Sequence, residues 1–166
     1  SHVKIEGEIT KIDSNFVHLK NGRSIRAKAI IDCRGLNYSQ HFNGAFQKFY
    51  GQVIETQQPH LIKTPTVMDS NVAQFDGFRF FYILPFSERR LLIEETFYSK
   101  TQNLATDAQE RIREYCRTRG WIIQSVHHIE TSCLPIPFTR SAQFPNRHSL
   151  ALGMAGGTYH PLTGYS

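Results

Sequence analysis

The segment SLALGMAGGTYHPLTGYS, residues 149–166, decides how the fold of this chain is interpreted. Its first four residues, 149–152, form a short apolar run that predicts a buried strand, and the run leads directly into Gly153, Gly156 and Gly157. Glycine lets the backbone come close to a ligand, and the N-terminus of a following helix offers free N–H groups to a phosphate. The segment therefore indicates a nucleotide-binding turn, with an ordinary tight turn as the alternative.

The end of the same segment has the composition of a helix start. Pro161 fixes its own φ, and Thr163 and Ser166 carry hydroxyl groups that can cap the first N–H groups of a helix. We expect that helix to begin at or after Ser166, where the sequence stops. Because the first residue is also not Met, the chain is expected to be a piece of a longer protein.

The N-terminal part predicts a β-meander followed by a change of sheet. Residues 3–9 and 16–19 alternate apolar and polar side chains, as half-exposed strands do, and an Asn-Gly turn separates them from a strand at 24–27. Residues 29–35, AIIDCRG, are different, because a continuous apolar run stopped by Asp and Gly is typical of a strand buried on both faces of a parallel sheet. Cys33, within that strand, is expected to be an inert structural thiol.

The middle of the chain predicts a second, antiparallel sheet. Aromatic and branched residues, which favour strands, are dense from 46–55 onward. Residues 78–84 and 91–97 are expected to pair with each other across a turn near 87–89. This region would be a separate sheet from the one near the chain ends.

One helix is predicted after this sheet. Between residues 106 and 119 apolar side chains recur at helical spacing, with Asp107 near the start and Gly120 just past the end. A further strand is expected at 121–126. The chain as a whole is therefore of the α/β class.

Glu94 and Glu95 are adjacent carboxylates in the apolar run 91–97. Neighbouring residues of a strand point to opposite faces of the sheet, so the two side chains cannot share one pocket. We expect one of them to face a cavity, where burial among aromatic rings favours the protonated form that a general acid needs. The other would face solvent or a salt bridge. The alternative is that both are structural and pair with Arg89 or Arg90.

Aromatic side chains are concentrated around the two glutamates. They either form the core of the sheet or line a binding site for a substrate, and the sequence is compatible with both. Because aromatic faces stabilise cations, an acid surrounded by aromatic rings would suit a reaction through a carbocation. These residues are Phe75, Phe78, Phe80, Phe81, Tyr82, Phe97 and Tyr98.

Composition argues against several other classes of protein. No apolar run approaches the roughly 20 residues that cross a membrane, and the formal charge of +5 is spread along the chain instead of forming a nucleic-acid-binding stripe. We expect no nucleic-acid partner; the basic surface is either solvated or attracted to an anionic membrane leaflet. The three cysteines form no CxxC pair, which fits a reducing cytoplasm, and the histidines lack zinc-site spacing, so no metal is expected.

Five motifs, in the right order along nearly the whole chain, resemble the lycopene β-cyclase family of bacteria and plants. The most specific is HPLTGYS at 160–166. The others are IDCRG at 31–35; FQ at 46–47 with Gly51; PTVMD at 65–69 through QFDGFRF at 74–80 and LP at 84–85; and IEET at 93–96.

This resemblance implies an FAD/NAD(P)-binding flavoprotein fold like that of the glutathione reductase and p-hydroxybenzoate hydroxylase group. Residues 1–43 and 147–166 would belong to the FAD-binding domain, and residues 44–146 to a β-rich substrate domain with one main helix. The Gly-x-Gly-x-x-Gly fingerprint expected near a family N-terminus is missing. The chain by itself is therefore expected to hold only part of the flavin site.

The resemblance also implies an activity. The family closes the linear end groups of lycopene into β-rings, giving γ-carotene and then β-carotene without net redox change, with reduced FAD as cofactor and NAD(P)H as its reductant. The intact protein would act on lycopene and other acyclic carotenoids as a cytoplasmic enzyme at the membrane surface. The rivals are a monooxygenase or prenyl reductase of the same fold and a non-catalytic carotenoid- or lipid-binding module.

Individual residues receive roles from the same resemblance. The acidic motif maps the essential glutamate of the family onto Glu94, with Glu95 beside it as a second catalytic candidate. Phe80, Tyr82 and Phe97 are the expected substrate contacts. The residues expected to bind FAD are Asp32, Arg34, Gly35, Gly153, Ala155, Gly156, Gly157, His160, Pro161, Thr163, Gly164 and Tyr165.

Overall fold

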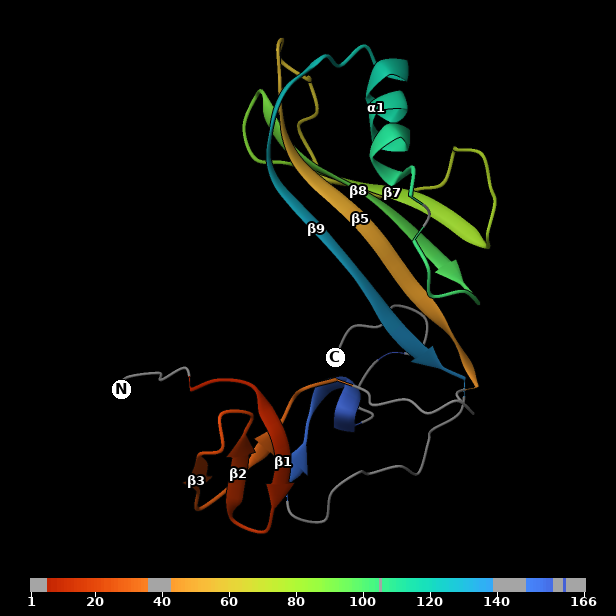
Figure 1. Cartoon of the computed structure of the whole chain (residues 1–166). Helices are drawn as coiled ribbons and strands as arrows, with labels where there is room; N and C mark the ends of the chain where they lie inside the picture. Colours follow the sequence, from red (N-terminus) through yellow and green to blue (C-terminus); the bar gives the residue numbers. More distant parts are fainter. Residues whose placement is uncertain (1–5, 36–42, 105, 139–148, 157–159, 161–166) are drawn as a thin grey trace. The chain divides into compact units, whose positions relative to one another are not determined.

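The computed structural model describes residues 6–35, 43–104, 106–138, 149–156 and 160. The chain divides into two compact units (Figure 1). The first is formed by Ser1–Phe42 together with Thr139–Ser166, and the second by Asn43–Phe138. The first unit therefore contains residues from both ends of the sequence, whereas the second is one continuous segment.

The first unit begins with the predicted antiparallel meander. Asn21 and Gly22 form the expected turn, in which Gly22 has a φ of +84° and its N–H bonds to the Leu19 carbonyl. Residues 6–8, which we expected in the first strand, lie outside it, because Gly7 has a φ of +135° that interrupts an extended strand. The strands are β1 (Ile9–Asp13), β2 (Phe16–Leu19) and β3 (Ser24–Arg26).

The first unit also contains two very short parallel strands, β4 (Ile31–Asp32) and β10 (Leu150–Ala151), which pair with each other. The parallel pairing agrees with the prediction, but the predicted burial is wrong. Ile31 is 59% exposed and Leu150 is 61% exposed, because two strands of two residues each are too small to enclose their own side chains. Cys33 is also exposed instead of buried in a strand.

The second unit is a five-stranded antiparallel sheet with the strand order β6, β7, β8, β5, β9 (Figure 1). The long strand β5 lies between β8 and β9 and pairs with both along most of its length. The strands are β5 (Gly44–Thr56), β6 (Thr66–Asp69), β7 (Phe78–Pro85), β8 (Arg90–Ser99) and β9 (Ile123–Pro137).

Strands β7 and β8 form the predicted hairpin. Ile83 pairs with Ile93, and the N–H groups of Phe86 and Ser87 both donate to the Arg90 carbonyl to close the turn. Branched and aromatic side chains dominate both strands, and such residues pack well on a pleated surface. The prediction of this pairing is confirmed.

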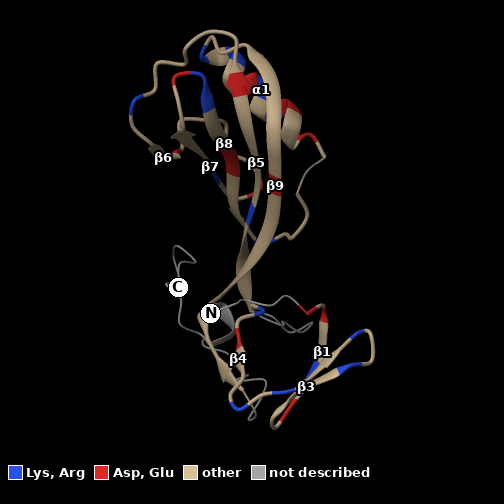
Figure 2. Cartoon of the chain, turned by 90° about the vertical axis from the view of Figure 1, so that its left-hand side faces the viewer, with Lys and Arg blue, Asp and Glu red and all other residues tan. Residues whose placement is uncertain are grey.

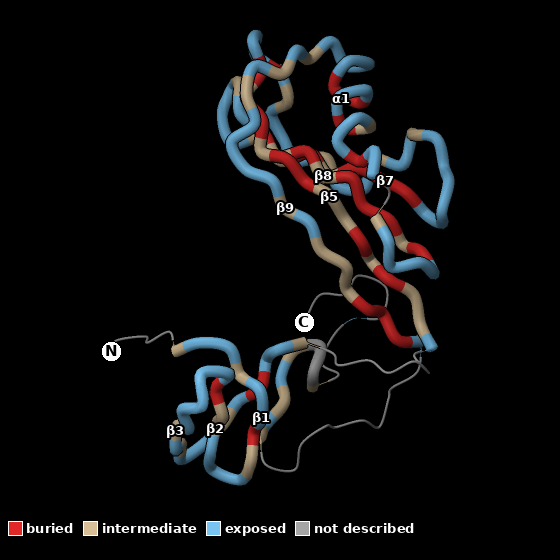
Figure 3. Tube along the Cα trace, in the orientation of Figure 1, coloured by how far each residue is buried: buried red, intermediate tan, exposed pale blue. Residues whose placement is uncertain are grey.

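Helix α1 (Ala108–Thr118) confirms the predicted helix and covers one face of the sheet (Figure 1). Its apolar stripe packs on buried side chains of β5, β7 and β8, which Figure 3 shows as buried stretches of these strands. The Tyr115 ring stacks on Phe81 with 4.0 Å between the ring centroids. The shared core consists of Ile54, Phe81, Ile83, Leu91, Ile93, Ile112, Tyr115 and Cys116.

Two strands of the second unit differ from the prediction. Strand β9 continues to Pro137, far beyond the expected end at 126, because it pairs with β5 along most of its length. Strand β6 was not predicted; it is short, and a register irregularity interrupts its pairing with β7. Both misses arise where pairing with a distant segment, and not local alternation, sets the strand.

A buried lysine fixes the loop that leads into β7. Lys48 is 1% exposed, and its ammonium group donates to Asp76 Oδ2 at 2.6 Å, Thr101 Oγ1 at 2.8 Å and the Asn103 carbonyl at 2.7 Å. All three N–H donors of the ammonium are therefore satisfied, as a buried charge requires. The loop is held where Gly77 passes close to β8.

Gly77 cannot accept a side chain without moving the backbone. Its φ is +101°, and a Cβ atom built on it would lie 2.1 Å from the Tyr98 carbonyl oxygen. We expect Gly77→Ala to destabilise the protein by roughly 2 kcal/mol. The measurement is the urea midpoint of unfolding. Gly120→Ala is the matched control, because Gly120 also has a positive φ of +71° but has nothing within 4 Å of a built Cβ. Equal midpoints for the two variants would contradict the prediction.

Candidate functional site

Glu94 and Glu95 lie on opposite faces of the sheet, as strand alternation requires. Glu95 is on the face that helix α1 covers and is 0% exposed. Its carboxylate accepts hydrogen bonds from Arg79 Nε at 2.6 Å, Arg111 Nε at 2.7 Å and Arg111 Nη2 at 2.7 Å. A buried carboxylate with two guanidinium partners is a structural ion cluster that joins β7, β8 and α1.

Aromatic rings enclose this ion cluster. The Arg79 guanidinium lies 4.8 Å from the centroid of the Phe75 ring, and Phe75 packs on Phe97 with 5.5 Å between centroids. Phe97 is 2% exposed and, like Glu95, faces the covered side of the sheet. We therefore exclude Glu95 and Phe97 from the proposed site, because both lie on the helix-covered face, opposite to Glu94. Arg89, one expected partner, instead pairs with Glu55.

Glu94 lies on the other face of the same strand, in a row that crosses four strands. It pairs with Tyr82 of β7 on one side and with Gly51 of β5 on the other, and Gly51 in turn pairs with Glu130 of β9. Directly paired residues of an antiparallel sheet project from the same face. We call the side of the sheet that carries this row the Glu94 face.

The surroundings of Glu94 favour its protonated form. Burial raises the pKa of the Glu94 carboxyl, a hydrogen bond from the Thr96 hydroxyl lowers it, and the Glu130 carboxyl raises it through its charge and a shared hydrogen bond. The net direction is upward, toward neutral pH. The Thr96 hydroxyl donates to Glu94 Oε1 at 2.6 Å, which fixes the orientation of the carboxyl group. This is the environment of a general acid.

Aromatic side chains lie beside Glu94 on its face. Phe80 is fully buried, and its ring meets Tyr82 edge-on with 5.2 Å between centroids. Phe78 and Tyr98 pack on the same Phe80 ring at 5.4 Å and 5.8 Å. Of the three expected substrate contacts, the sheet thus brings Phe80 and Tyr82 to the face of Glu94, and places Phe97 on the opposite one.

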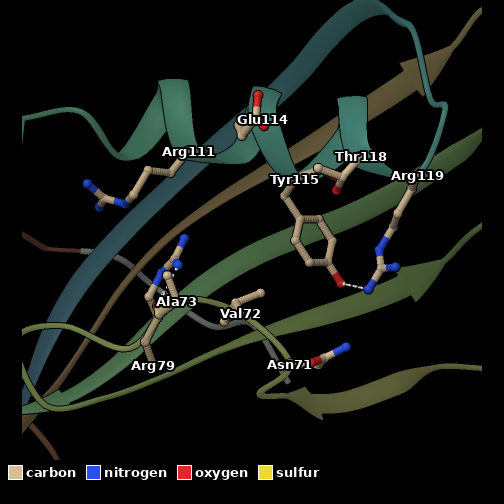
Figure 4. A pocket seen from close by; sticks show the side chains of 9 residues that line it. All are labelled: Asn71, Val72, Ala73, Arg79, Arg111, Glu114, Tyr115, Thr118 and Arg119. Carbon is tan, nitrogen blue, oxygen red and sulfur yellow. Dashed lines mark hydrogen bonds between the residues drawn. The ribbon is translucent and has the colours of Figure 1, made fainter.

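A pocket of about 550 Å³ lies on the helix-covered side, between α1 and the loop before β7 (Figure 4). Most of its lining residues are polar or charged types, and its arginines already have anionic partners: Arg79 and Arg111 bind Glu95, and Arg119 binds Asp69. The pocket therefore belongs to the structural ion network. Its lining residues are Asn71, Val72, Ala73, Arg79, Arg111, Glu114, Tyr115, Thr118 and Arg119.

The first unit carries the residues expected to bind a nucleotide cofactor. Arg34 donates two side-chain hydrogen bonds to Asp32, at 2.9 Å and 2.8 Å, and these bonds lower the pKa of the Asp32 carboxyl. Gly35 after β4 and Gly153 after β10 have φ values of +88° and +62°. A glycine turn after each parallel strand leaves the backbone open at the carboxyl ends of the strands, which fits a dinucleotide cofactor.

Part of this expected cofactor site lies outside the described residues. Within them, Gly153, Ala155 and Gly156 form the 3-10 turn η1 (Gly153–Gly156), and His160 is exposed. The expected FAD-binding residues outside the described part are Gly157, Pro161, Thr163, Gly164 and Tyr165.

Two residues of the Glu94 row, Gly51 and Glu130, were not predicted from the sequence as site residues. Gly51 was noted only as part of a motif, and Glu130 was not singled out, because the strand around it was expected to end at 126. The apolar residues Ile123, Val126 and Ile129 recur every third residue instead of alternating, so no local pattern indicated that β9 continues to Glu130.

The sequence model of the family described as "Lycopene cyclase protein" matches residues 4–166 of the chain. The chain belongs to this family. It is 39% identical over 171 residues to a lycopene beta-cyclase of Paracoccus sp. and 36% identical over 168 residues to one of Pantoea ananas. These alignments cover 100% and 99% of the chain, but only 44% of each relative. The chain thus spans less than half the length of the curated relatives it matches.

Two solved structures are similar to the chain with a TM-score of 0.50. HpxO from Klebsiella pneumoniae, complexed with FAD, has a TM-score of 0.50 and 16% identity, covering 90% of the chain and 43% of that structure. The halogenase PltM also has a TM-score of 0.50, with 15% identity, covering 97% of the chain and 36% of that structure. At such identities the likeness concerns the fold alone. It confirms the FAD/NAD(P)-binding flavoprotein fold that the lycopene cyclase resemblance implied.

Charge and hydropathy add two findings about the described residues. None of their helices has the length and apolar character needed to cross a membrane, and no group of three or more His, Cys, Asp or Glu side chains among them is arranged to hold a metal ion. Lys and Arg residues lie at separate places along the chain in both units (Figure 2).

Proposed function

We propose that the intact protein is a lycopene β-cyclase, which closes the linear end groups of lycopene into β-rings, first to γ-carotene and then to β-carotene. The observation that carries the proposal is Glu94, a carboxyl with a raised pKa beside Phe80 and Tyr82 on the face of the sheet opposite α1. The names of the relatives from Paracoccus sp. and Pantoea ananas support the same activity.

Glu94 is the proposed acid. Its proton adds to the terminal carbon–carbon double bond of an end group, and the neighbouring double bond then attacks the resulting cation to close a six-membered ring. Loss of a proton from the ring cation forms the β-ring, so the overall reaction involves no net redox change. Glu94, now ionised, would take that proton back, which would restore the acid for the second end group.

The other side chains of the Glu94 face support this step. The Thr96 hydroxyl donates to Oε1 of Glu94 and fixes the orientation of the carboxyl group. The π-faces of Phe80 and Tyr82 would stabilise the carbocation without reacting as bases. Phe80 is fully buried and Tyr82 is half-buried, so little water would reach the cation beside them.

In the proposed domain assignment, the first unit is part of the FAD-binding domain and the second unit is the substrate domain. Gly35, Gly153 and the Asp32–Arg34 pair would hold FAD at the ends of β4 and β10. Reduced FAD, when bound and kept reduced by NAD(P)H, would supply negative charge that stabilises the carbocation. All proton transfers remain with protein side chains.

The substrate also suggests where the enzyme works. Lycopene is a hydrocarbon that partitions into membranes, and the chain has a formal charge of +5. We therefore propose peripheral binding to anionic membranes. Sedimentation of the purified intact protein with anionic vesicles, but not with neutral ones, is the expected result.

The proposed function is tested by expressing the intact protein in bacteria that accumulate lycopene. The expected result is conversion of lycopene to β-carotene, measured by chromatography of the extracted pigments. Unchanged lycopene would count against a cyclase. An oxygenated or reduced carotenoid, with stoichiometric consumption of NAD(P)H, would instead favour a monooxygenase or reductase of the same fold.

A further inference from the structure

Glu130 reaches Glu94 across an intervening strand. Neighbouring strands of a sheet are about 4.8 Å apart, so residues on β8 and β9 are separated by two such steps with β5 between them. At the level of Glu94 and Glu130, β5 carries Gly51, which has no side chain. A Cβ atom built on Gly51 would lie 3.0 Å from Glu130 Cγ and 3.1 Å from Glu130 Oε1. The Glu130 side chain therefore lies over Gly51, in the space that a side chain there would fill.

We propose that Glu130 is a positioning residue of the cyclisation: it reaches over Gly51 to share one proton with Glu94, and so keeps Glu94 protonated for attack on the carotenoid. This inference rests on the proposed function. Glu130 does not itself touch the reacting carbon. It acts through Glu94, and Gly51 provides the gap in which the two carboxyl groups meet.

The chemistry of paired carboxyl groups supports this role. Two carboxylates at hydrogen-bond distance repel each other, so such a pair retains one proton at a pH where an isolated carboxyl group has lost it. The Thr96 hydroxyl occupies Glu94 Oε1, which leaves the second oxygen of Glu94 to carry the shared proton. After protonation of the substrate, two negative charges would face the carbocation and draw the proton of the ring back to Glu94.

Few other charged groups face this pair in the described residues. On β7 the direct neighbour of Glu94 is Tyr82, and β5 contributes Gly51 and Val53 to this part of the face. On β9 the nearest titratable side chain besides Glu130 is His128, which pairs with Val53 and is exposed. His128 is therefore the second side chain whose effect on Glu94 has to be separated from that of Glu130.

The test is the pH dependence of the cyclisation rate of the intact protein with reduced FAD and lycopene in lipid vesicles. The wild-type rate is expected to fall as the pH rises through the pKa of Glu94, because the acid must be protonated. In Glu130→Gln that fall should occur about one pH unit lower, so that the rate above it drops roughly tenfold while the low-pH plateau is kept. Gly51→Ala should move the curve in the same direction, because the new methyl group displaces the Glu130 side chain.

The controls separate this role from a structural one. His128→Gln should leave the position of the falling limb unchanged. If the rate of Glu130→Gln falls at the same pH as the wild-type rate, the proposal is overturned. A rate loss of equal size at every pH also overturns it, because such a loss would indicate a structural defect.

A second measurement distinguishes failure of this proposal from failure of the proposed function. The infrared carbonyl band of a protonated carboxyl group, assigned by its loss in Glu94→Gln, reports the protonation of Glu94 whether or not lycopene is converted. The band should disappear at a lower pH in Glu130→Gln than in the wild type. If the band titrates identically in both proteins, Glu130 has no such role, even where cyclisation is observed.

Discussion

Glu94→Gln is expected to stop ring formation while the protein stays folded and retains its flavin. The substitution keeps the size and shape of the side chain but removes the acidic proton, and the loss of a general acid lowers rates by about 100-fold to 10,000-fold. Lycopene should therefore persist in a lycopene-producing strain that carries the variant. The pigments are measured by chromatography, and bound flavin is measured by its absorbance in the purified protein.

Glu55→Gln is the matched control for this result. Glu55 lies on the same face as Gly51 on strand β5, four residues further along, and its carboxylate pairs with Arg89 and His127 at the surface. The substitution removes one carboxylate from the same face but changes no residue of the Glu94 row, so cyclisation should continue. Persistent β-carotene formation by Glu94→Gln, or equal losses in both variants, would contradict the role of Glu94.

Glu95→Gln, in contrast to Glu94→Gln, is expected to cause a large loss of stability. The substitution leaves the Arg79 and Arg111 guanidinium groups next to a neutral amide in a site that is 0% exposed at Glu95. Removing one partner of a buried ion pair costs about 3–5 kcal/mol. Here Arg79 loses its carboxylate partner, and Arg111 keeps its pair with Asp107 at the surface. The free energy of unfolding is measured by urea denaturation of the intact protein.

Glu114→Gln provides the comparison for this second result. Glu114 pairs with Arg117 one turn along helix α1, at the surface, and side-chain pairs of this kind contribute little to stability. Its urea midpoint should remain close to that of the wild type. A similar midpoint for Glu95→Gln would show that the buried cluster is not required for the fold.

Local sequence patterns were sufficient for the elements that depend on near neighbours. The hairpin of β7 and β8 and the helix α1 follow from alternation, turn residues and a 3.6-residue period, and each was predicted. Strand alternation also predicted that Glu94 and Glu95 lie on opposite faces of the sheet. It did not say which glutamate the helix would cover, because that depends on the packing of Ile112 and Tyr115 against the sheet.

The candidate site was harder to predict, because it also depends on packing and on pairing between distant strands. Phe80 and Phe97 are both aromatic residues close to the glutamates in sequence, yet one lies on the Glu94 face and the other in the ion cluster. Glu130 is distant from Glu94 along the chain and meets it only because β5 pairs with both of their strands. Such long-range pairing leaves no local pattern that a single sequence displays.

Gly51 has a consequence for the natural variation of this family. A residue with a side chain at this position competes for volume with the Glu130 side chain, whose Cγ is 3.0 Å from a built Cβ. The two positions are therefore expected to change together during evolution. Homologues that acquire a larger residue at position 51 should carry a shorter residue at position 130, whereas glycine at 51 should accompany glutamate at 130.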